Sequence, residues 1–183
     1  MSESDAQLLA ILTGEKEWLT YEGTLTPLFY PADEMRTHYK LRAARELVTR
    51  LLCEGIYRDE SFSSPDSVTR YLKLHYKERH HEVFTVMFVD SQNRLIEIED
   101  MFRGTLSQTS VYPREVVRKA LAVHAAAVVL AHNHPSGVAE PSRADEALTQ
   151  SLKSALALVD VRVLDHVVIA GTTHISMAER GLI

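Results

Sequence analysis

The feature that most constrains the fold of this chain is an apolar run that ends abruptly in a polar loop and is followed by a helix. Residues Val128–Ala131 have the apolar composition of a buried strand. The Pro-Ser-Gly segment at 135–137 then interrupts the strand, and Pro141 suits the first turn of a helix that extends to Leu158. The sequence therefore predicts a strand, a short loop and a helix in succession.

Four polar side chains lie at fixed spacing within this segment. His132 and His134 are two residues apart, so they project from the same face of a strand. Ser142 and Asp145 are three residues apart, so they lie one turn apart on one side of the helix. Two imidazoles and one carboxylate form a three-ligand set, which leaves a fourth tetrahedral position for water, as in catalytic zinc sites.

Simpler interpretations exist for each part of this pattern. A polar loop after a buried strand would explain the histidines, and a helix N-cap with an acidic third residue would explain Ser142 and Asp145. The cap does not account for two histidines on one strand face so close to it. The sequence therefore predicts a metal site formed by His132, His134 and Asp145.

The same residues carry a resemblance to a known family. His132-x-His134, seven residues, Ser142, two residues and Asp145 resemble the JAMM signature of JAB/MPN metalloprotease-like domains. The segments that resemble the RadC branch of these domains are Val111–Val117, Ala131–Gly137, Val163–Val168 and Glu179–Leu182. The resemblance covers residues 64–183, and we expect residues 1–63 to be an N-terminal extension with one helix.

The resemblance implies both a fold and a cofactor. The fold is a single JAB/MPN-like, cytidine-deaminase-like domain with a curved mixed sheet flanked by helices. The cofactor is one Zn²⁺ per chain, held by His132, His134 and Asp145, which would lower the pKa of a bound water molecule and polarise a carbonyl oxygen. Ser142 resembles the JAMM serine, whose hydroxyl steadies this water and the developing oxyanion.

The JAMM pattern also requires a glutamate upstream as general base and then acid. Glu82 is the preferred candidate because it opens the predicted strand Val83–Val89, as the JAMM glutamate precedes the first central strand. Glu99 is the alternative, although glutamates alternate with isoleucines around it, which is typical of a half-exposed strand without catalysis. His166, in an apolar strand next to Asp165, is either a core residue or a partner that supports a metal ligand from behind.

The remaining elements agree with an α/β or α+β sandwich around one curved sheet. Helices and strands alternate without a strict βαβ repeat. The predicted helices cover 4–14, 33–54 (with a stop at Gly55), 64–78, 113–125 and 141–158, and the predicted strands cover 83–89, 94–103, 128–131, 162–170 and 173–177. There is no apolar run long enough to span a membrane and no secretory signal, so we expect a cytoplasmic protein.

Three functions are compatible with these residues. The first is a zinc hydrolase that cuts a peptide or isopeptide bond, which makes a peptide or protein the expected substrate. The second is a DNA repair or DNA-processing factor, as the RadC association suggests, but the formal charge of −5 argues against strong binding to phosphates. The basic residues of 36–50 and 70–81 are interleaved with glutamates and apolar residues, as on solvated helix faces. The third is a metal-binding interaction module without turnover.

Overall fold

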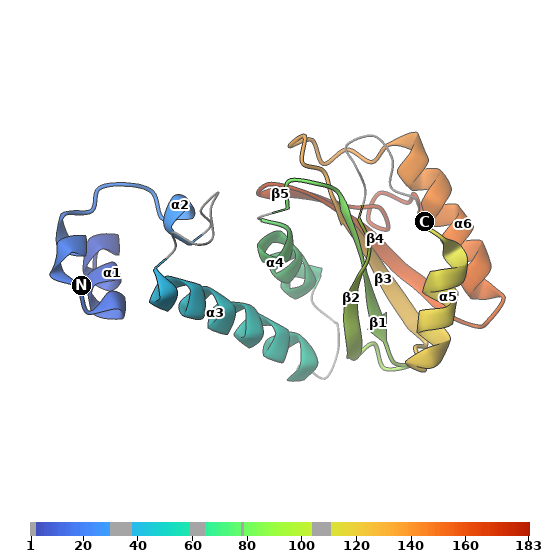
Figure 1. The fold of residues 1–183 in the computed structure, drawn as a ribbon. Coiled ribbons are helices and arrows are strands. Elements are labelled where there is room, and N and C mark those ends of the chain that lie inside the picture. Colours follow the sequence, from blue (N-terminus) through green and yellow to red (C-terminus); the bar gives the residue numbers. More distant parts are fainter. Residues whose placement is uncertain (1–2, 30–37, 59–64, 78, 104–110) are drawn as a thin grey trace. The chain divides into compact units, whose positions relative to one another are not determined.

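A computed structural model describes residues 3–29, 38–58, 65–77, 79–103 and 111–183 of the chain (Figure 1). The chain forms two compact units, residues 1–51 and residues 52–183. Within the described ranges, no helix combines the length and apolar character that crossing a membrane requires.

The first unit begins with helix α1 (Asp5–Thr13), whose two ends are defined by local chemistry. The Ser4 hydroxyl accepts a hydrogen bond from the Gln7 amide at 3.2 Å, and the Gln7 side chain accepts one from the Ser4 amide at 2.8 Å. Gly14 ends the helix in the left-handed conformation, at a φ of 76°. The predicted helix over 4–14 is therefore confirmed, with a serine cap at its start and a glycine at its end.

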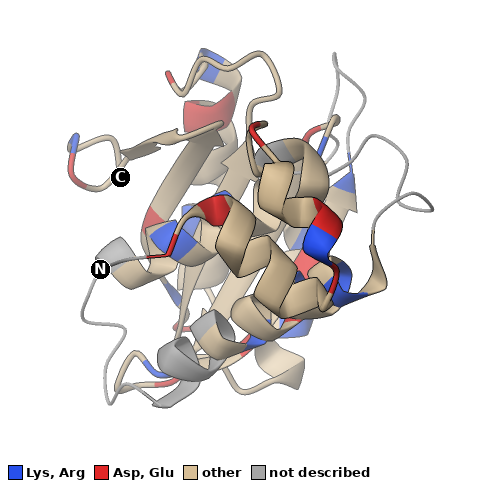
Figure 2. Cartoon of the chain, turned by 90° about the vertical axis from the view of Figure 1, so that its left-hand side faces the viewer, with Lys and Arg blue, Asp and Glu red and all other residues tan. Residues whose placement is uncertain are grey.

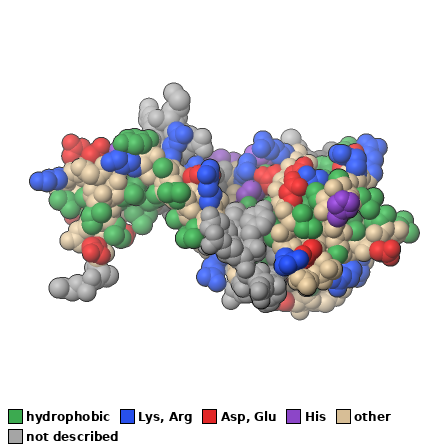
Figure 3. Space-filling view, turned by 90° about the horizontal axis from the view of Figure 1, so that it is seen from below, with side chains coloured by type: hydrophobic (Ala, Val, Ile, Leu, Met, Phe, Trp, Pro, Cys, Tyr) green, Lys and Arg blue, Asp and Glu red, His purple; other side chains and the backbone are tan. Residues whose placement is uncertain are grey.

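Among the described residues, α1 is followed by η1 (Lys16–Thr20), α2 (Thr26–Phe29) and α3 (Tyr39–Arg58). The ammonium group of Lys40, in α3, donates a hydrogen bond to the carbonyl oxygen of Thr13 at the end of α1. The sequence predicts an apolar stripe along this helix; of its described members, Leu41 is buried, whereas Leu47, Val48 and Leu51 are exposed, Leu47 and Leu51 by about two-thirds. Figure 3 shows hydrophobic side chains on the surface of this unit.

The prediction that Gly55 stops this helix is wrong. Helix α3 continues through Gly55 to Arg58. Glycine costs only about 1 kcal/mol in a helix interior relative to alanine, so neighbouring turns can carry the helix past it. The predicted start of this helix at Asp33 lies outside the described residues.

The second unit is built on a five-stranded sheet with the order β2-β1-β3-β4-β5. Its strands are β1 (Val83–Val89), β2 (Leu95–Arg103), β3 (Ala127–Asn133), β4 (Arg162–Ala170) and β5 (Thr173–Ser176). Strand β3 pairs antiparallel with β1 and parallel with β4, so the sheet is mixed. All seven residues of β1 and all seven of β3 are buried. These two strands therefore form the centre of the domain.

Helices cover both faces of the sheet (Figure 1). Helix α4 (Pro65–Tyr76) packs on one face through Val68, Tyr71 and Leu72, in a core shared with alternate residues of β1 such as Met87. Helices α5 (Pro113–Ala122) and α6 (Arg143–Ala157) cover the other face, where the cluster consists of Phe84, Val86, Phe88, Val116, Ala120, Ala125, Val128, Leu130, Leu152, Leu156 and Val161. The predicted α/β sandwich around one mixed sheet is confirmed.

The helix and strand of the polar motif differ slightly from their predicted bounds. Strand β3 extends to Asn133, so it includes the first motif histidine. Helix α6 begins at Arg143 with Ser142 as its N-cap, so the prediction that Pro141 occupies the first helical turn is wrong. A serine whose hydroxyl accepts from an amide three residues later fixes the helix start more strongly than a proline preference does.

Charged residues are mixed over the surface rather than separated by sign. Figure 2 shows Lys and Arg as well as Asp and Glu on the side that faces the viewer, and neither sign is gathered into one patch. Several of them form ion pairs within one helix, such as Arg118 with Glu115 at 2.9 Å in α5. This distribution agrees with the solvated helix faces expected from the sequence.

Candidate metal centre

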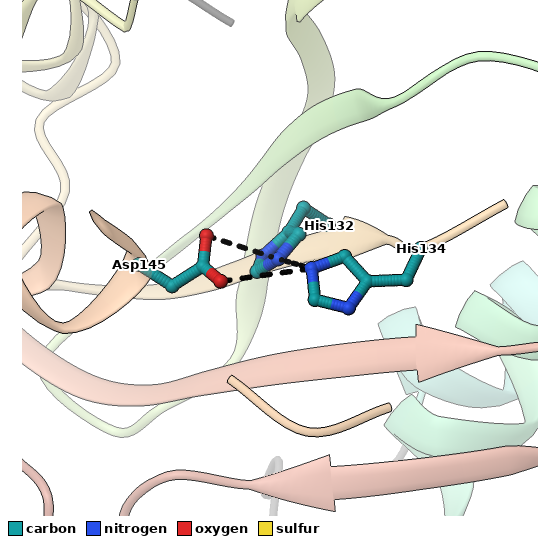
Figure 4. Close-up of side chains that lie close together, drawn as sticks. All are labelled: His132, His134 and Asp145. Atoms are coloured by element: carbon teal, nitrogen blue, oxygen red, sulfur yellow. Dashed lines mark hydrogen bonds and ion pairs between the residues drawn. The ribbon is translucent and has the colours of Figure 1, made fainter. Parts of the chain in front are cut away.

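The side chains of His132, His134 and Asp145 converge at the end of strand β3 (Figure 4). His132 lies within β3, opposite Phe84 of β1, and its side chain faces helix α6. His134 follows the strand, and its amide donates to the carbonyl oxygen of Ile169 at 2.7 Å, which continues the pairing with β4. Asp145 lies in the first turn of α6.

One potential ligand atom from each of these three residues lies within 4.8 Å of the others. The two Nε2 atoms of His132 and His134 are 2.9 Å apart. The Asp145 carboxylate is 3.3 Å from His132 Nε2 through Oδ1 and 3.6 Å from His134 Nε2 through Oδ2. Among the residues that the structure describes, this is the only such group of three or more histidine, cysteine or acidic side chains.

The hydrogen bonds on the far side of the rings determine what the ligand atoms offer. His134 Nδ1 is 2.8 Å from the carbonyl oxygen of Val138, which can only accept, so a proton lies on Nδ1 and, in the neutral ring, Nε2 carries the lone pair. His132 Nδ1 is 2.8 Å from Nε2 of His166. The cluster thus directs imidazole nitrogens and a carboxylate at one point, which is the donor set that binds Zn²⁺.

Electrostatics within the cluster favour a positive charge at that point. Burial alone would raise the pKa of the Asp145 carboxyl, but hydrogen bonds from His132, His134 and Ser142 outweigh it and hold the pKa far below its usual range. The hydrogen bond to Asp145 raises the pKa of His134 against the opposing effect of burial, and the negative charge of Glu82 adds to the increase. A carboxylate and two imidazoles this close therefore attract either a proton or a metal cation.

Ser142 serves as the helix cap and also contacts the carboxylate ligand. Its hydroxyl accepts from the Asp145 amide at 3.2 Å and donates to Asp145 Oδ2 at 2.7 Å, and its own amide donates to the same oxygen at 2.7 Å. The N-cap that we considered as a simpler explanation is thus present together with the convergent histidines. The cap orients Asp145 so that Oδ1 faces His132.

The structure separates the two glutamates considered as general base. Glu82 lies directly before β1, and its charge acts on His134. Phe84 is paired with His132, so continuing this register by two residues would bring Glu82 opposite His134. Glu99, in β2, forms an ion pair with Lys119 of α5 at 2.6 Å. The negative charge of Glu82 thus acts on a member of the cluster, whereas Glu99 is paired with Lys119.

Two buried residues behind the cluster have a larger part in it than their sequence positions indicated. His166, in β4, is fully buried next to His132, and burial lowers its pKa to about 3. Thr149, in α6, is fully buried too, and its hydroxyl is 2.6 Å from His166 Nδ1. The sequence left two roles open for His166. For Thr149, the one indication in the sequence was its position one helical turn after Asp145.

Asp165 and Asn133, the neighbours of these histidines, face other groups. Asp165 accepts from the amide of Ala178 at 3.0 Å and from the Ser176 hydroxyl at 2.6 Å, so it fixes the turn after β5. Asn133 Oδ1 accepts from the amide of Val83 at 2.8 Å on the opposite face of the sheet. Neither side chain belongs to the cluster.

Comparison with known proteins agrees with this fold. The family model for the RadC-like JAB domain matches residues 62–182. The chain is 64% identical over 144 residues to a protein of Acidovorax sp. (strain JS42) and 63% identical over 144 residues to one of Polaromonas sp. (strain JS666 / ATCC BAA-500), both named only as UPF0758 proteins. These matches cover 79% of this chain but 60% and 64% of the two relatives, so the chain spans less than two-thirds of their length. The chain belongs to the RadC-like JAB domain family.

Proposed function

We propose that this protein is a zinc-dependent hydrolase that cuts a peptide or isopeptide bond. The observation that carries the proposal is the convergence of His132, His134 and Asp145, with the proton of His134 held on the side away from the cluster. A three-ligand set leaves one coordination position for water or substrate, which is typical of catalytic rather than structural zinc. The membership in the JAB domain family supports the same reaction class.

Zinc held by these residues would supply an activated water molecule and polarise the carbonyl group of the substrate. The Glu82 carboxylate would take the proton of that water and return it to the leaving amine. The Ser142 hydroxyl, which here donates to Asp145, would turn toward the oxygen of the scissile carbonyl as negative charge develops there. The three ligand side chains are 7%, 13% and 17% exposed, so solvent can reach the cluster from one side.

A peptide substrate agrees better with the surface than a nucleic acid does. The formal charge is −5, and basic residues are interleaved with acidic ones on the face in Figure 2. DNA binding by charge neutralisation requires basic residues gathered on one face.

The metal site is tested by measuring zinc in the purified protein. We expect one Zn²⁺ per chain in the wild type and a loss of zinc in His134→Ala. His174→Ala is the matched control, because His174 is exposed in β5 and lies outside the cluster. Equal zinc content in all three proteins would contradict the ligand assignment.

The reaction is tested by turnover on peptide and isopeptide libraries, with single- and double-stranded DNA assayed in parallel. Glu82→Gln should lower kcat by about 10²- to 10⁴-fold with its zinc retained, because a general base is removed. Glu99→Gln should leave kcat within about twofold. If Glu99→Gln is the inactive variant, the base is misassigned. Cleavage of DNA would favour a DNA-processing enzyme, and zinc binding without any cleavage would favour an interaction module.

A further inference from the structure

Behind the metal ligands, a chain of buried hydrogen bonds connects strand β3 to helix α6. His132 Nδ1 lies 2.8 Å from His166 Nε2, and His166 Nδ1 lies 2.6 Å from the Thr149 hydroxyl. That hydroxyl is also 2.6 Å from the backbone carbonyl oxygen of Asp145. The chain therefore starts at one proposed ligand and ends on the backbone of another.

The direction of every hydrogen bond in this chain follows from its last acceptor. The Asp145 carbonyl oxygen cannot donate, so the short contact between the two oxygens requires the single hydroxyl proton of Thr149. Having used that proton, the hydroxyl can only accept from His166, whose proton must lie on Nδ1. His166 Nε2 then carries a lone pair and accepts from the Nδ1–H group of His132.

The reverse direction would leave contacts unsatisfied. If Thr149 donated to His166 instead, two oxygen atoms would face each other at 2.6 Å without a proton between them. The other acceptor near the hydroxyl is the Met177 sulfur at 3.8 Å, which is a weak acceptor. The Thr149 bond to Asp145 also follows a pattern that threonine commonly forms in helices, with the carbonyl four residues earlier.

Burial holds this arrangement in place. Thr149 and His166 are fully buried and His132 is 6% exposed, so water does not compete for their polar atoms. Phe84 stacks on His132 at a ring-centroid distance of 6.5 Å and meets His166 edge-on at 5.6 Å. The three rings therefore occupy one packed layer in which neither imidazole can rotate without displacing a neighbour.

We propose that Thr149 and His166 are positioning residues that fix His132 as the Nδ1–H tautomer, so that its Nε2 lone pair faces the cation. This inference rests on the metal site of the proposed function and adds two residues that the ligand motif does not contain. The same series of hydrogen bonds connects the backbone at Asp145 to the ring of His132. The Thr149 hydroxyl therefore sets the spacing between two proposed ligands that lie on different elements.

The test uses Thr149→Val, which removes the hydroxyl at nearly constant volume, and Thr149→Ser, which restores it. Zinc affinity is measured by competition with a chelator. Thr149→Val should bind zinc about 10- to 100-fold more weakly, as expected when the group that orients a ligand is lost. Thr149→Ser should return to within about threefold of the wild type. Circular dichroism and thermal unfolding show that each variant is folded.

A second readout reports the tautomer directly. The ¹⁵N shifts of the histidine side chains distinguish Nδ1–H from Nε2–H, and we expect Nδ1–H at His132 and at His166 in the wild type. In Thr149→Val, the signals of His166 and His132 should change to a mixture of tautomers. Unchanged zinc affinity and unchanged shifts in Thr149→Val would overturn the inference, as would an Nε2–H proton on His132 in the wild type.

The experiments distinguish a failure of the proposed metal site from a failure of the positioning role. If the wild type binds no zinc, the metal site is wrong, and the ¹⁵N shifts of the metal-free protein still decide whether Thr149 fixes the tautomer of His132. If the wild type binds zinc and Thr149→Val binds it equally well, the metal site stands and the positioning role is wrong.

Discussion

Two clusters of histidine and carboxylate lie on opposite faces of the same sheet, and their chemistry differs. On the α6 face, Asp145 meets the Nε2 atoms of two histidines. On the α4 face, Asp100 of β2 meets one histidine, His75, at 2.6 Å, together with the guanidinium of Arg79 at 2.9 Å and the Thr85 hydroxyl at 2.8 Å.

The difference lies in whether the carboxylate already has a permanent cation beside it. Arg79 is charged at every relevant pH, so it balances the charge of Asp100 within the protein. Asp145 has no such partner among the described residues and lies instead beside the imidazoles of His132 and His134. The Asp100 cluster is complete as it stands and fastens α4 to the sheet. The Asp145 cluster is complete only with a proton or a metal ion.

The largest expected difference between the two clusters is in zinc affinity. Asp145→Asn removes an anionic ligand and should weaken zinc binding on the order of a thousandfold, since even residues that only orient ligands account for 10- to 100-fold. Asp100→Asn should bind zinc like the wild type. Chelator competition measures both, and a similar loss in the two variants would show that the clusters are not independent.

The next effect is on folding stability, and here Asp100→Asn should lose more than Asp145→Asn. Asp100→Asn leaves Arg79 partly buried without its anion and should lower the free energy of unfolding by about 3 kcal/mol. Asp145→Asn, measured without metal, should lose less because no permanent cation is left unpaired. Urea unfolding of both variants checks this order.

The contribution of Asp100 should also depend on pH. Burial alone would raise its pKa, but hydrogen bonds from His75 and Thr85 and the charges of His75 and Arg79 hold the pKa below its ordinary value of 3.8. A carboxyl whose pKa is lowered by folding stabilises the protein above its unfolded-state pKa, and this stabilisation is lost as the pH falls through the folded-state pKa. The stability difference between wild type and Asp100→Asn should therefore be constant near neutral pH and shrink below about pH 4. A difference that grows on acidification would contradict this account.

The smallest effect concerns the serine that donates to Asp145. Ser142→Ala removes a helix cap and should cost about 1 kcal/mol of stability. Ser4→Ala removes the equivalent cap of α1 and is the matched control. Both should lower stability similarly, measured by thermal unfolding, but only Ser142→Ala should change the hydrolysis rate. An unchanged rate in Ser142→Ala would limit the role of this residue to capping.

Local patterns in the sequence predicted most of the elements and the convergence of the ligand motif. His132, His134 and Asp145 lie within one strand, one loop and one helix that follow each other in the sequence. Their spacing therefore predicts that they converge without knowledge of the tertiary structure. The histidine behind the ligands could not be placed in the same way. His166 reaches His132 only because β4 lies parallel to β3, with Leu130 opposite His166.

The Asp100 cluster was missed for the same reason. His75 and Arg79 are four residues apart, but Thr85 and Asp100, which complete the cluster, come from two strands that only the tertiary fold brings beside them. The apolar stripe of α3 shows a further limit. A helical pattern predicted correctly that a helix forms, but not that Leu47 and Leu51 are exposed, because periodicity does not specify what covers a helix face.

The position of β3 between β1 and β4 gives the three ligands unequal freedom. His132 is held by backbone ladders on both sides, so its amide should exchange with deuterium only on global unfolding. Asp145 lies in the first turn of a helix, and His134 lies past the end of the antiparallel ladder with β1, where opening requires far less energy. The site therefore combines one residue that the sheet holds in place, His132, with two that can move more easily, His134 and Asp145. We expect a cation to enter or leave without disturbing the middle of the sheet.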